Sequence, residues 1–386
     1  MPMKSYLLAP GPTPVPSEAL LAMAQPMIHH RTPQFSAIFA EAAEGLKYVF
    51  QTEQDVLMLS ASGSGAMEAA VTNCMRKGEK AIVVNGGKFG ERWGKICKAY
   101  GIEVIELKVE WGQAVEVAAV EKALKENDNV GGIFVQASET STTVAHPIEA
   151  LAALTKDTDT LLVVDGITAV GVFDLPMDKW GIDVLVSGSQ KAFMLPPGLA
   201  FIALSDKAWK KQAEGDLPKF YFNLATEKKN MADQTTAWTP AVSLIIGLVE
   251  VLKLIKNEGL ENGFKRQALL AKAVREAFKA HGFKMVAPDA PSPATTGVFV
   301  PEGINGGALV KYLRDTMGVT LAGGQDQFKG KIFRVAHLGY FEPFDIITAV
   351  AAIEMALQRF GADIELGKGV GVAQKILCDF YAAPSK

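Results

Sequence analysis

Short, almost uninterrupted apolar runs alternate with helical patterns through the middle of the chain. The runs predict strands at 80–86, 102–109, 130–137, 160–167, 183–189 and 199–205, with helices between them at 66–77, 87–100, 117–126 and 147–156. Several runs are apolar at nearly every position, as in strands that are covered on both faces. The alternation predicts an α/β layered domain with a mostly parallel sheet, where ligands bind beyond the carboxyl ends of the strands.

The pattern changes near residue 240. The stretch "TPAVSLIIGLVEVLKLIKNEG" (239–259) predicts a long helix that leaves the first domain. A smaller α/β domain follows, with helices at about 262–280, 307–316 and 343–360 and strands at 295–301 and 331–339. We therefore expect a large domain at 15–255 and a small domain at 256–386 that also includes the N-terminal segment 1–14. The tail 361–386 fits a short helix before a loose end.

Composition and charge exclude several classes of function. The formal net charge of −3, without a run of lysine or arginine, argues against nucleic acid as a partner. No apolar stretch is long enough to span a bilayer, so we expect no membrane partner. The three cysteines are far apart in the sequence and show neither metal-ligand spacing nor a disulfide framework, which favours a reducing cytoplasm.

A possible anion site lies in "SASGSGAMEAA" (60–70). Small residues precede a helix that is expected to start near Ala66: Ser62, Gly63, Ser64 and Gly65. A helix N-terminus offers free N–H groups and a partial positive charge, while glycine permits close approach and serine adds a hydroxyl. The segment is a candidate phosphate cradle, with an ordinary turn as the alternative.

Two ionisable residues end neighbouring predicted strands. Asp165 ends "LLVVD", and Lys191 follows "DVLVSGSQ". Taken alone, the aspartate could cap a turn and the lysine could lie on the surface. Together with the cradle, they suit pyridoxal 5′-phosphate (PLP), which needs a phosphate site, a carboxylate against its ring nitrogen and a lysine that forms a Schiff base.

These motifs give the chain a recognisable resemblance. It resembles the class V aminotransferases of the fold-type I PLP enzymes, most closely the alanine–glyoxylate and serine–glyoxylate (serine–pyruvate) group. The motifs that carry the resemblance are, in chain order, "LLAPGPTPVP", "PMIHHRTPQF", "SGSGAMEAA", "NGGKFGERW", "SETSTT", "VVDGITAVG", "SGSQKAFMLPPGLAF", "TPAVSL" and "FRVAHLG". The resemblance covers nearly the whole chain. It implies a seven-stranded sheet in the large domain and a homodimer with a shared active site.

The resemblance also implies roles for individual residues. Lys191 would form the Schiff base and move the substrate's α-proton, while Asp165 would keep the ring nitrogen protonated. The other cofactor residues would be those at the phosphate (Ser62, Gly63, Ser64, Gly65, Gln190), near the ring hydroxyl (Ser141) and on the ring faces (Phe89, Ile167). Phe89 stands where the family often has tryptophan.

Further implied positions concern the substrate and the second subunit. Arg334 would bind the substrate α-carboxylate, because a guanidinium pairs with a carboxylate in bidentate geometry, and backbone near Gly11 would close the same pocket. Thr239 would reach the phosphate from the neighbouring subunit, although Thr236 stands where the family often has tyrosine. Arg31 is a minor substrate-site candidate. The adjacent histidines before it show no third ligand, so we expect no metal.

The resemblance predicts transamination between alanine or serine and glyoxylate or pyruvate, with ping-pong kinetics. Other class V specificities, of the phosphoserine or aspartate type, remain alternatives. A desulfurase needs a cysteine in the small domain, and "VTLAGGQDQFKGKIF" has none. Chains of this group have also been labelled hydrogenase subunits, but three scattered cysteines cannot ligate iron–sulfur or nickel–iron centres.

Overall fold

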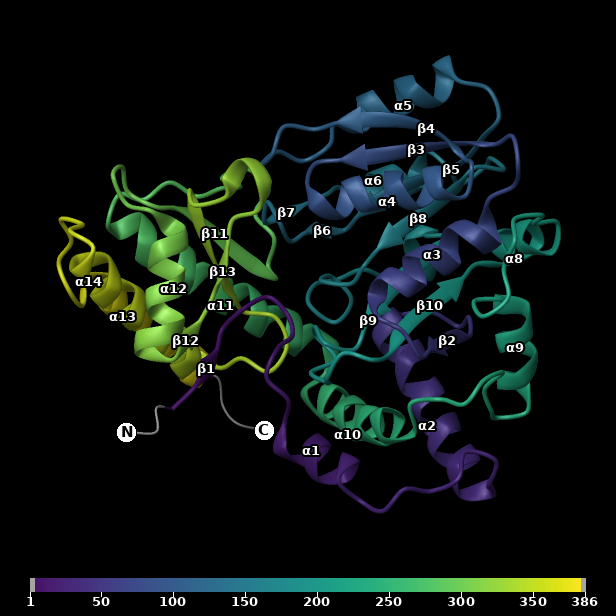
Figure 1. Ribbon diagram of the computed structural model, residues 1–386, viewed down its shortest axis with the longest axis horizontal. Helices are drawn as coiled ribbons and strands as arrows, with labels where there is room; N and C mark the ends of the chain where they lie inside the picture. Colours follow the sequence, from purple (N-terminus) through teal and green to yellow (C-terminus); the bar gives the residue numbers. More distant parts are fainter. Residues whose placement is uncertain (1–3, 383–386) are drawn as a thin grey trace.

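A seven-stranded sheet forms the centre of the larger part of the molecule (Figure 1). The computed structural model describes residues 4–382. In spatial order the strands are β2 (Val56–Leu59), β10 (Ala200–Leu204), β9 (Val184–Gly188), β8 (Leu161–Asp165), β5 (Val130–Gln136), β3 (Lys80–Asn85) and β4 (Glu103–Lys108). Only β10 runs antiparallel to its neighbours, so the prediction of a mostly parallel sheet is confirmed.

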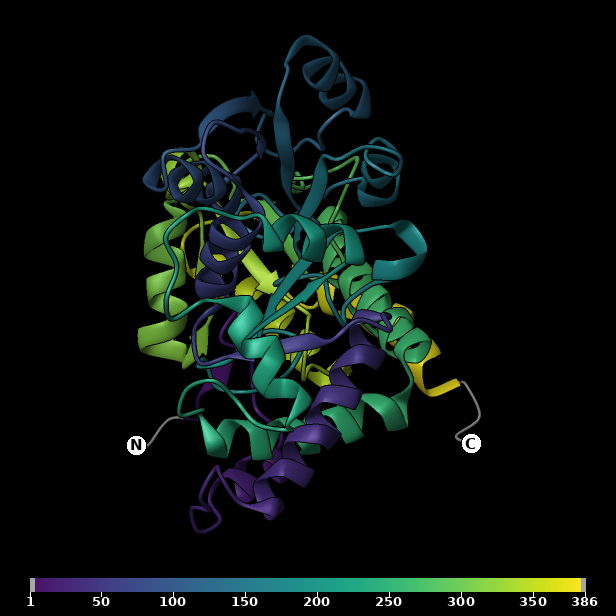
Figure 2. The same cartoon turned by 90° about the vertical axis from the view of Figure 1, so that its right-hand side faces the viewer.

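Both faces of this sheet are covered by helices. On one side, Phe134 and Val163 pack with α3 (Gly63–Cys74) and α4 (Lys88–Ala99). On the other, Ile133 and Leu162 pack with α2 (Pro33–Phe50), α5 (Val117–Glu126), α6 (Ile148–Ala153) and α10 (Val242–Glu258). Figure 2 shows α2 and α10 lying against each other. Because successive side chains of a strand point to opposite faces, two apolar faces require a continuous apolar run.

A second core lies in the smaller part, beside the large sheet in Figure 1. Its sheet has the order β11 (Thr295–Phe299), β14 (Ile332–Ala336) and β13 (Ala322–Gly323), packed with α11 (Leu260–Ala280), α12 (Gly306–Met317), α13 (Pro343–Arg359) and α14 (Lys368–Ala382). The N-terminal strand β1 (Tyr6–Leu7) pairs with β12 (Val319–Thr320) of this part. The boundary at 255/256 stays a prediction.

Several expected boundaries were wrong. Helix α3 begins at Gly63 rather than near Ala66, because the small residues form its first turn, and it ends at Cys74. Helix α14 (Lys368–Ala382) is longer than the short helix that was expected, and the buried Glu354 anchors its start by accepting hydrogen bonds from the N–H groups of Gly367 and Gly369. The expected loose end lies beyond residue 382, outside the described residues.

Some short elements gave no clear pattern in the sequence. They are α1 (Ser17–Met23), α7 (Met177–Trp180), α8 (Asp206–Ala213), α9 (Leu224–Ala232), β6 (Ser138–Glu139), β7 (Val144–Ala145) and a 3-10 turn at Asp326–Phe328. Strand β2 and helix α2 were also missed. No helix within residues 4–382 combines the length and apolar character that a membrane span needs.

Candidate active site

The loop after β9 holds Lys191 at the carboxyl end of the sheet. The Ser189 hydroxyl donates to the Pro196 carbonyl oxygen at 2.7 Å and accepts from the Leu199 N–H at 3.2 Å. The Ser189 N–H donates to the Leu199 carbonyl oxygen at 2.9 Å. These bonds close residues 189–199 into a fixed turn, so the backbone that carries Lys191 cannot move freely.

Lys191 lies against the N-terminal segment of the chain. Its Nζ donates to the Pro10 carbonyl oxygen at 2.6 Å, and its side chain occupies the space where a Cβ on Gly11 would lie. Gly11 has φ +138°, which favours glycine. Burial lowers the pKa of Lys191 to about 8. The positive charges of Arg334 and Arg92 lower this pKa further, whereas the negative charge of Asp165 raises it. A lysine with this pKa is partly neutral near pH 7–8 and can act as a nucleophile.

Asp165 is the last residue of β8 and is buried. Its Oδ1 accepts from the Ile167 N–H at 2.9 Å, so it does cap a turn. Among residues 4–382, no cationic side chain lies within 4.0 Å of it. Burial raises its pKa to about 7. A buried carboxylate without a cation fits a ligand that brings an N–H donor.

The candidate cradle forms the first turn of α3. Ser62 is the N-cap, with extended backbone, and the Gly65 N–H donates to its carbonyl oxygen at 2.8 Å. The Ile167 side chain lies against Gly63, where a Cβ would collide with it. The Oε1 atom of Gln190 is buried without a hydrogen-bond partner. Small residues at a helix N-terminus fit a phosphate group. The Gln190 amide would have to turn by 180° to present its NH2 group, the donor that a phosphate oxygen needs.

Phe89 and Ser141 are joined by a buried glutamate that sequence reasoning missed. Glu139 accepts from the backbone N–H groups of Phe89 and Gly90, both at 3.0 Å, and from the N–H and hydroxyl of Ser141. It therefore caps α4, whose own N-cap Gly87 has no side chain. Burial raises the pKa of Glu139. The only signal in the sequence was an acid between buried segments, in "QASETSTT".

Arg334 connects the small part to the large one. It lies on β14, where its Nε donates to Gly323 at 3.0 Å and its Nη1 donates to Thr140 at 2.7 Å, both to carbonyl oxygens. Burial lowers its pKa to about 10, and Glu139 opposes the shift. The guanidinium is thus a buried cation held by neutral acceptors, a state that suits binding of a carboxylate.

Two predicted residues lie elsewhere in the protomer. Thr239 is exposed and lines a hollow with Met27, Ile28, His29 and His30. Arg31 is also exposed, and its Nη1 donates to the Thr235 hydroxyl at 2.6 Å and the Thr236 carbonyl oxygen at 2.9 Å. Within residues 4–382, no group of three or more His, Cys, Asp or Glu side chains could hold a metal ion.

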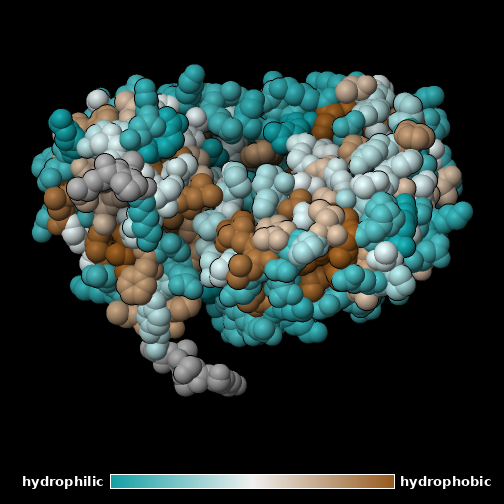
Figure 3. Space-filling view, turned by 60° about the horizontal axis from the view of Figure 1, so that its bottom comes forward, coloured by the Kyte–Doolittle hydropathy of each residue, from teal (hydrophilic) through white to brown (hydrophobic). Residues whose placement is uncertain are grey.

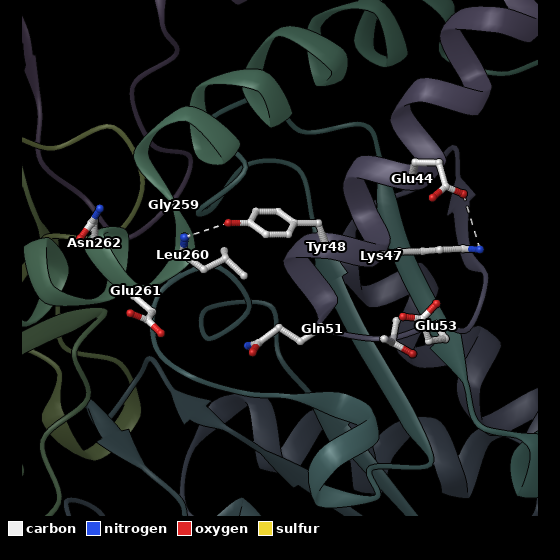
Figure 4. A pocket seen from close by; sticks show the side chains of 10 residues that line it. Glu44, Lys47, Tyr48, Gln51, Glu53, Gly259, Leu260, Glu261 and Asn262 are labelled. Atoms are coloured by element: carbon white, nitrogen blue, oxygen red, sulfur yellow. Dashed lines mark hydrogen bonds and ion pairs between the residues drawn. The ribbon is translucent and has the colours of Figure 1, made fainter. Parts of the chain in front are cut away.

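A separate surface hollow lies between α2 and the start of α11 (Figure 4). Tyr48 crosses it, and its hydroxyl accepts from the Leu260 N–H at 3.1 Å. The lining contains none of the predicted site residues. We therefore place the active-site candidate at the carboxyl ends of β8 and β9.

Comparison with known proteins agrees with this geometry. The sequence profile described as "Aminotransferase class-V" matches residues 5–334. A Synechococcus protein named soluble hydrogenase, small subunit, is 40% identical over 97% of this chain and 98% of its own length. L-aspartate–glyoxylate aminotransferase of Paracoccus denitrificans is 34% identical over 100% and 99%.

A solved structure supports the same assignment. The crystal structure of alanine–glyoxylate aminotransferase from Nostoc matches with a TM-score of 0.88 and 28% identity, over 92% of this chain and 96% of that one. The predicted fold type is thereby confirmed. With its seven-stranded sheet and the family profile over most of its length, the chain belongs to the class-V aminotransferases.

Proposed function

We propose that this aminotransferase uses PLP to exchange an amino group between a small amino acid, alanine or serine, and glyoxylate or pyruvate. The main observation in support of this proposal is that Lys191, Asp165 and the start of α3 lie together at the carboxyl end of the sheet. PLP supplies an aldehyde that combines with amines and a ring that accepts electron density. The residues described above have the chemistry to hold each part of it.

Each side chain has a distinct role in this proposal. The Nζ atom of Lys191 would hold the cofactor at its aldehyde carbon, and the free amine would take up or give back the proton of the substrate α-carbon. A pKa of about 8 suits both directions of that proton transfer near neutral pH. Asp165 would accept a hydrogen bond from the ring nitrogen, and Arg334 would bind the α-carboxylate.

The remaining residues orient the cofactor. Phe89 and Ile167 would cover the ring faces, and Ser141 would bind near the ring hydroxyl. The cradle and the neighbouring amide would hold the phosphate, that is Ser62, Gly63, Ser64, Gly65 and Gln190. Ile167 already contacts Gly63, which supports a common site for ring and phosphate.

We also propose a homodimer in which Thr239 serves the partner's site. Brown apolar patches lie on the face that Figure 3 turns forward, the lower side of Figure 1, where α1 and α10 lie. Three large apolar side chains from α1 and the segment after it are exposed: Leu20, Leu21 and Met27. Met27 lines the same hollow as Thr239. An exposed apolar surface of this kind is typical of a subunit interface. We also propose that the protein is located in the cytoplasm and that Arg31 contributes to the substrate site.

Glyoxylate appears as the acceptor in the names of both aminotransferases compared above, while their donors differ. Aspartate is therefore the second candidate donor, favoured by the name of the Paracoccus relative. The Synechococcus relative's name gives a weaker lead, because Cys74 and Cys97 are buried and Cys378 is exposed, without a shared ligand cluster in the described residues.

The decisive experiment is spectroscopic. Purified protein incubated with PLP should gain a visible absorption band that borohydride bleaches, and Lys191→Ala should lack it. A panel of alanine, serine and aspartate against glyoxylate and pyruvate then ranks the substrates. A protein that takes up no PLP, or that releases sulfide from cysteine without transamination, would refute the proposal.

A further inference from the structure

Arg92 links the candidate phosphate cradle to the predicted ring-stacking residue. It lies on α4, one turn after Phe89, and its Cζ is 4.9 Å from the centre of the Phe89 ring. Its Nη1 donates to the Ser64 hydroxyl at 2.8 Å. No role was predicted for Arg92 from the sequence. The two contacts hold its planar guanidinium in one orientation, because stacking and hydrogen bonding constrain it together.

The charge of Arg92 has no carboxylate in direct contact with it in the described part of the chain. Within residues 4–382, no carboxylate lies within 4.0 Å of it; the neighbouring Glu91 pairs with Lys88 and Lys95 instead. Ser64 belongs to the first turn of α3, where the helix dipole is also positive. A guanidinium beside a helix N-terminus is repulsive unless an anion lies between or next to them.

A second polar group, the amide of Gln190, lies beside the same turn. The Oε1 atom of Gln190 is buried and unpaired. It lies 3.1 Å from the Cβ position of Gly188, which is itself 3.5 Å from the Gly63 backbone nitrogen. A 180° turn of this amide presents its NH2 group, so Gln190, like Arg92 on α4, offers a donor beside the first turn of α3.

We propose that Arg92 is a phosphate-binding residue, and that its charge makes this site select the phosphorylated cofactor over pyridoxal. The inference rests on the proposed function. A phosphate monoester carries a charge of about −1.5 to −2 near pH 7, so a guanidinium in the cradle favours it strongly over a neutral hydroxymethyl group. The cradle's serine and glycine residues supply donors, and Arg92 supplies the cation.

The test compares two ligands that differ only in the phosphate. PLP and pyridoxal are titrated into the cofactor-free wild type, Arg92→Gln and the control Lys95→Gln, with binding read from the absorption spectrum. Lys95 is exposed on the same helix, so the control removes the same charge away from the cradle. We expect Arg92→Gln to weaken PLP binding by about 10- to 100-fold, as for a charge-assisted hydrogen bond, and pyridoxal binding by less than about 3-fold.

A second readout uses inorganic phosphate. Phosphate should compete with PLP in the wild type and much less in Arg92→Gln, while Lys95→Gln behaves as wild type. Equal losses for PLP and pyridoxal would show that Arg92 acts only by holding Phe89 in place. Unchanged PLP affinity with a selective loss of aspartate turnover would mean that Arg92 binds a donor's distal carboxylate. Either result, or unchanged behaviour throughout, overturns the proposal. A wild type that binds neither ligand would instead refute the proposed function beneath it.

Discussion

The Nζ atom of Lys191 and the carbonyl oxygen of Pro10 are hydrogen-bonded at 2.6 Å, although the residues are 181 positions apart. Pro10 follows β1, which pairs with the small part of the molecule, and Thr13 continues the contact by donating its hydroxyl to the Lys191 carbonyl oxygen at 2.8 Å. The N-terminal segment thus contacts both the small part of the molecule and Lys191, and it fixes the position of the lysine side chain.

Replacing Lys191 by alanine should abolish the borohydride-sensitive absorption and lower kcat by roughly 10²- to 10⁴-fold, the usual range for a lost acid–base group. The measurement is a steady-state assay with glyoxylate, combined with the spectrum. Lys256→Ala, an exposed lysine on α10, is the matched control. Substantial transamination by Lys191→Ala would contradict the role of Lys191.

Asp165 should make the stability of the cofactor-free protein depend on pH. Its pKa rises from 3.8 to about 7 on folding, so between these values the folded state binds more protons than the unfolded state. The free energy of unfolding should therefore fall, relative to Asp165→Asn, as the pH rises from about 4 to about 7. Urea unfolding at several pH values measures this, and parallel curves for the two proteins would disprove it.

Replacing Arg334 by lysine should lower kcat/KM by about 10- to 100-fold, because an ammonium cannot form the two-pronged carboxylate contact. The cofactor spectrum should be retained. Arg314→Lys, at an exposed arginine of α12, serves as the control. The hydrogen bond from Arg334 to Thr140 also joins the two parts of the molecule, so its loss could lower stability. The melting temperature of each variant is therefore measured together with its activity. A normal kcat/KM would remove Arg334 from carboxylate binding.

Glu139→Gln should lower the free energy of unfolding by roughly 1–3 kcal/mol, because an amide cannot accept all the bonds that converge on this carboxylate. It should also change the circular dichroism of bound cofactor, since Glu139 positions both Phe89 and Ser141. Glu103→Gln, on the exposed edge strand β4, provides the comparison. A stability loss with an unchanged cofactor signal would limit Glu139 to a structural role.

A shared active site predicts the activity of mixed dimers. Thr239→Val alone and Lys191→Ala alone should both be impaired. In a hybrid of the two, one site has an intact Lys191 together with an intact Thr239 from the other subunit. Unfolding and refolding a mixture of the variants should therefore restore activity. If Thr239 acted within its own subunit, the mixture would show no gain.

The sequence by itself determined every strand of the large sheet except β2, and it determined the order of the site motifs. Runs such as 161–164 are apolar at successive positions because both sheet faces are covered, so they stand out without any knowledge of their neighbours. The positions of Asp165 and Lys191 at strand ends followed from the same pattern. What the pattern could not specify was which distant segments meet there.

Only the tertiary structure decided which distant segments contact one another at the site. Pro10 contacts Lys191, Glu139 caps α4, and Arg92 contacts Ser64. These contacts join elements that are far apart in the sequence, and the periodicity of apolar residues does not encode which side chains meet. Strand β2 escaped prediction because four residues carry too little pattern. A charged side chain acquires a role when folding removes it from water and places one particular partner beside it, and that depends on packing rather than on local sequence.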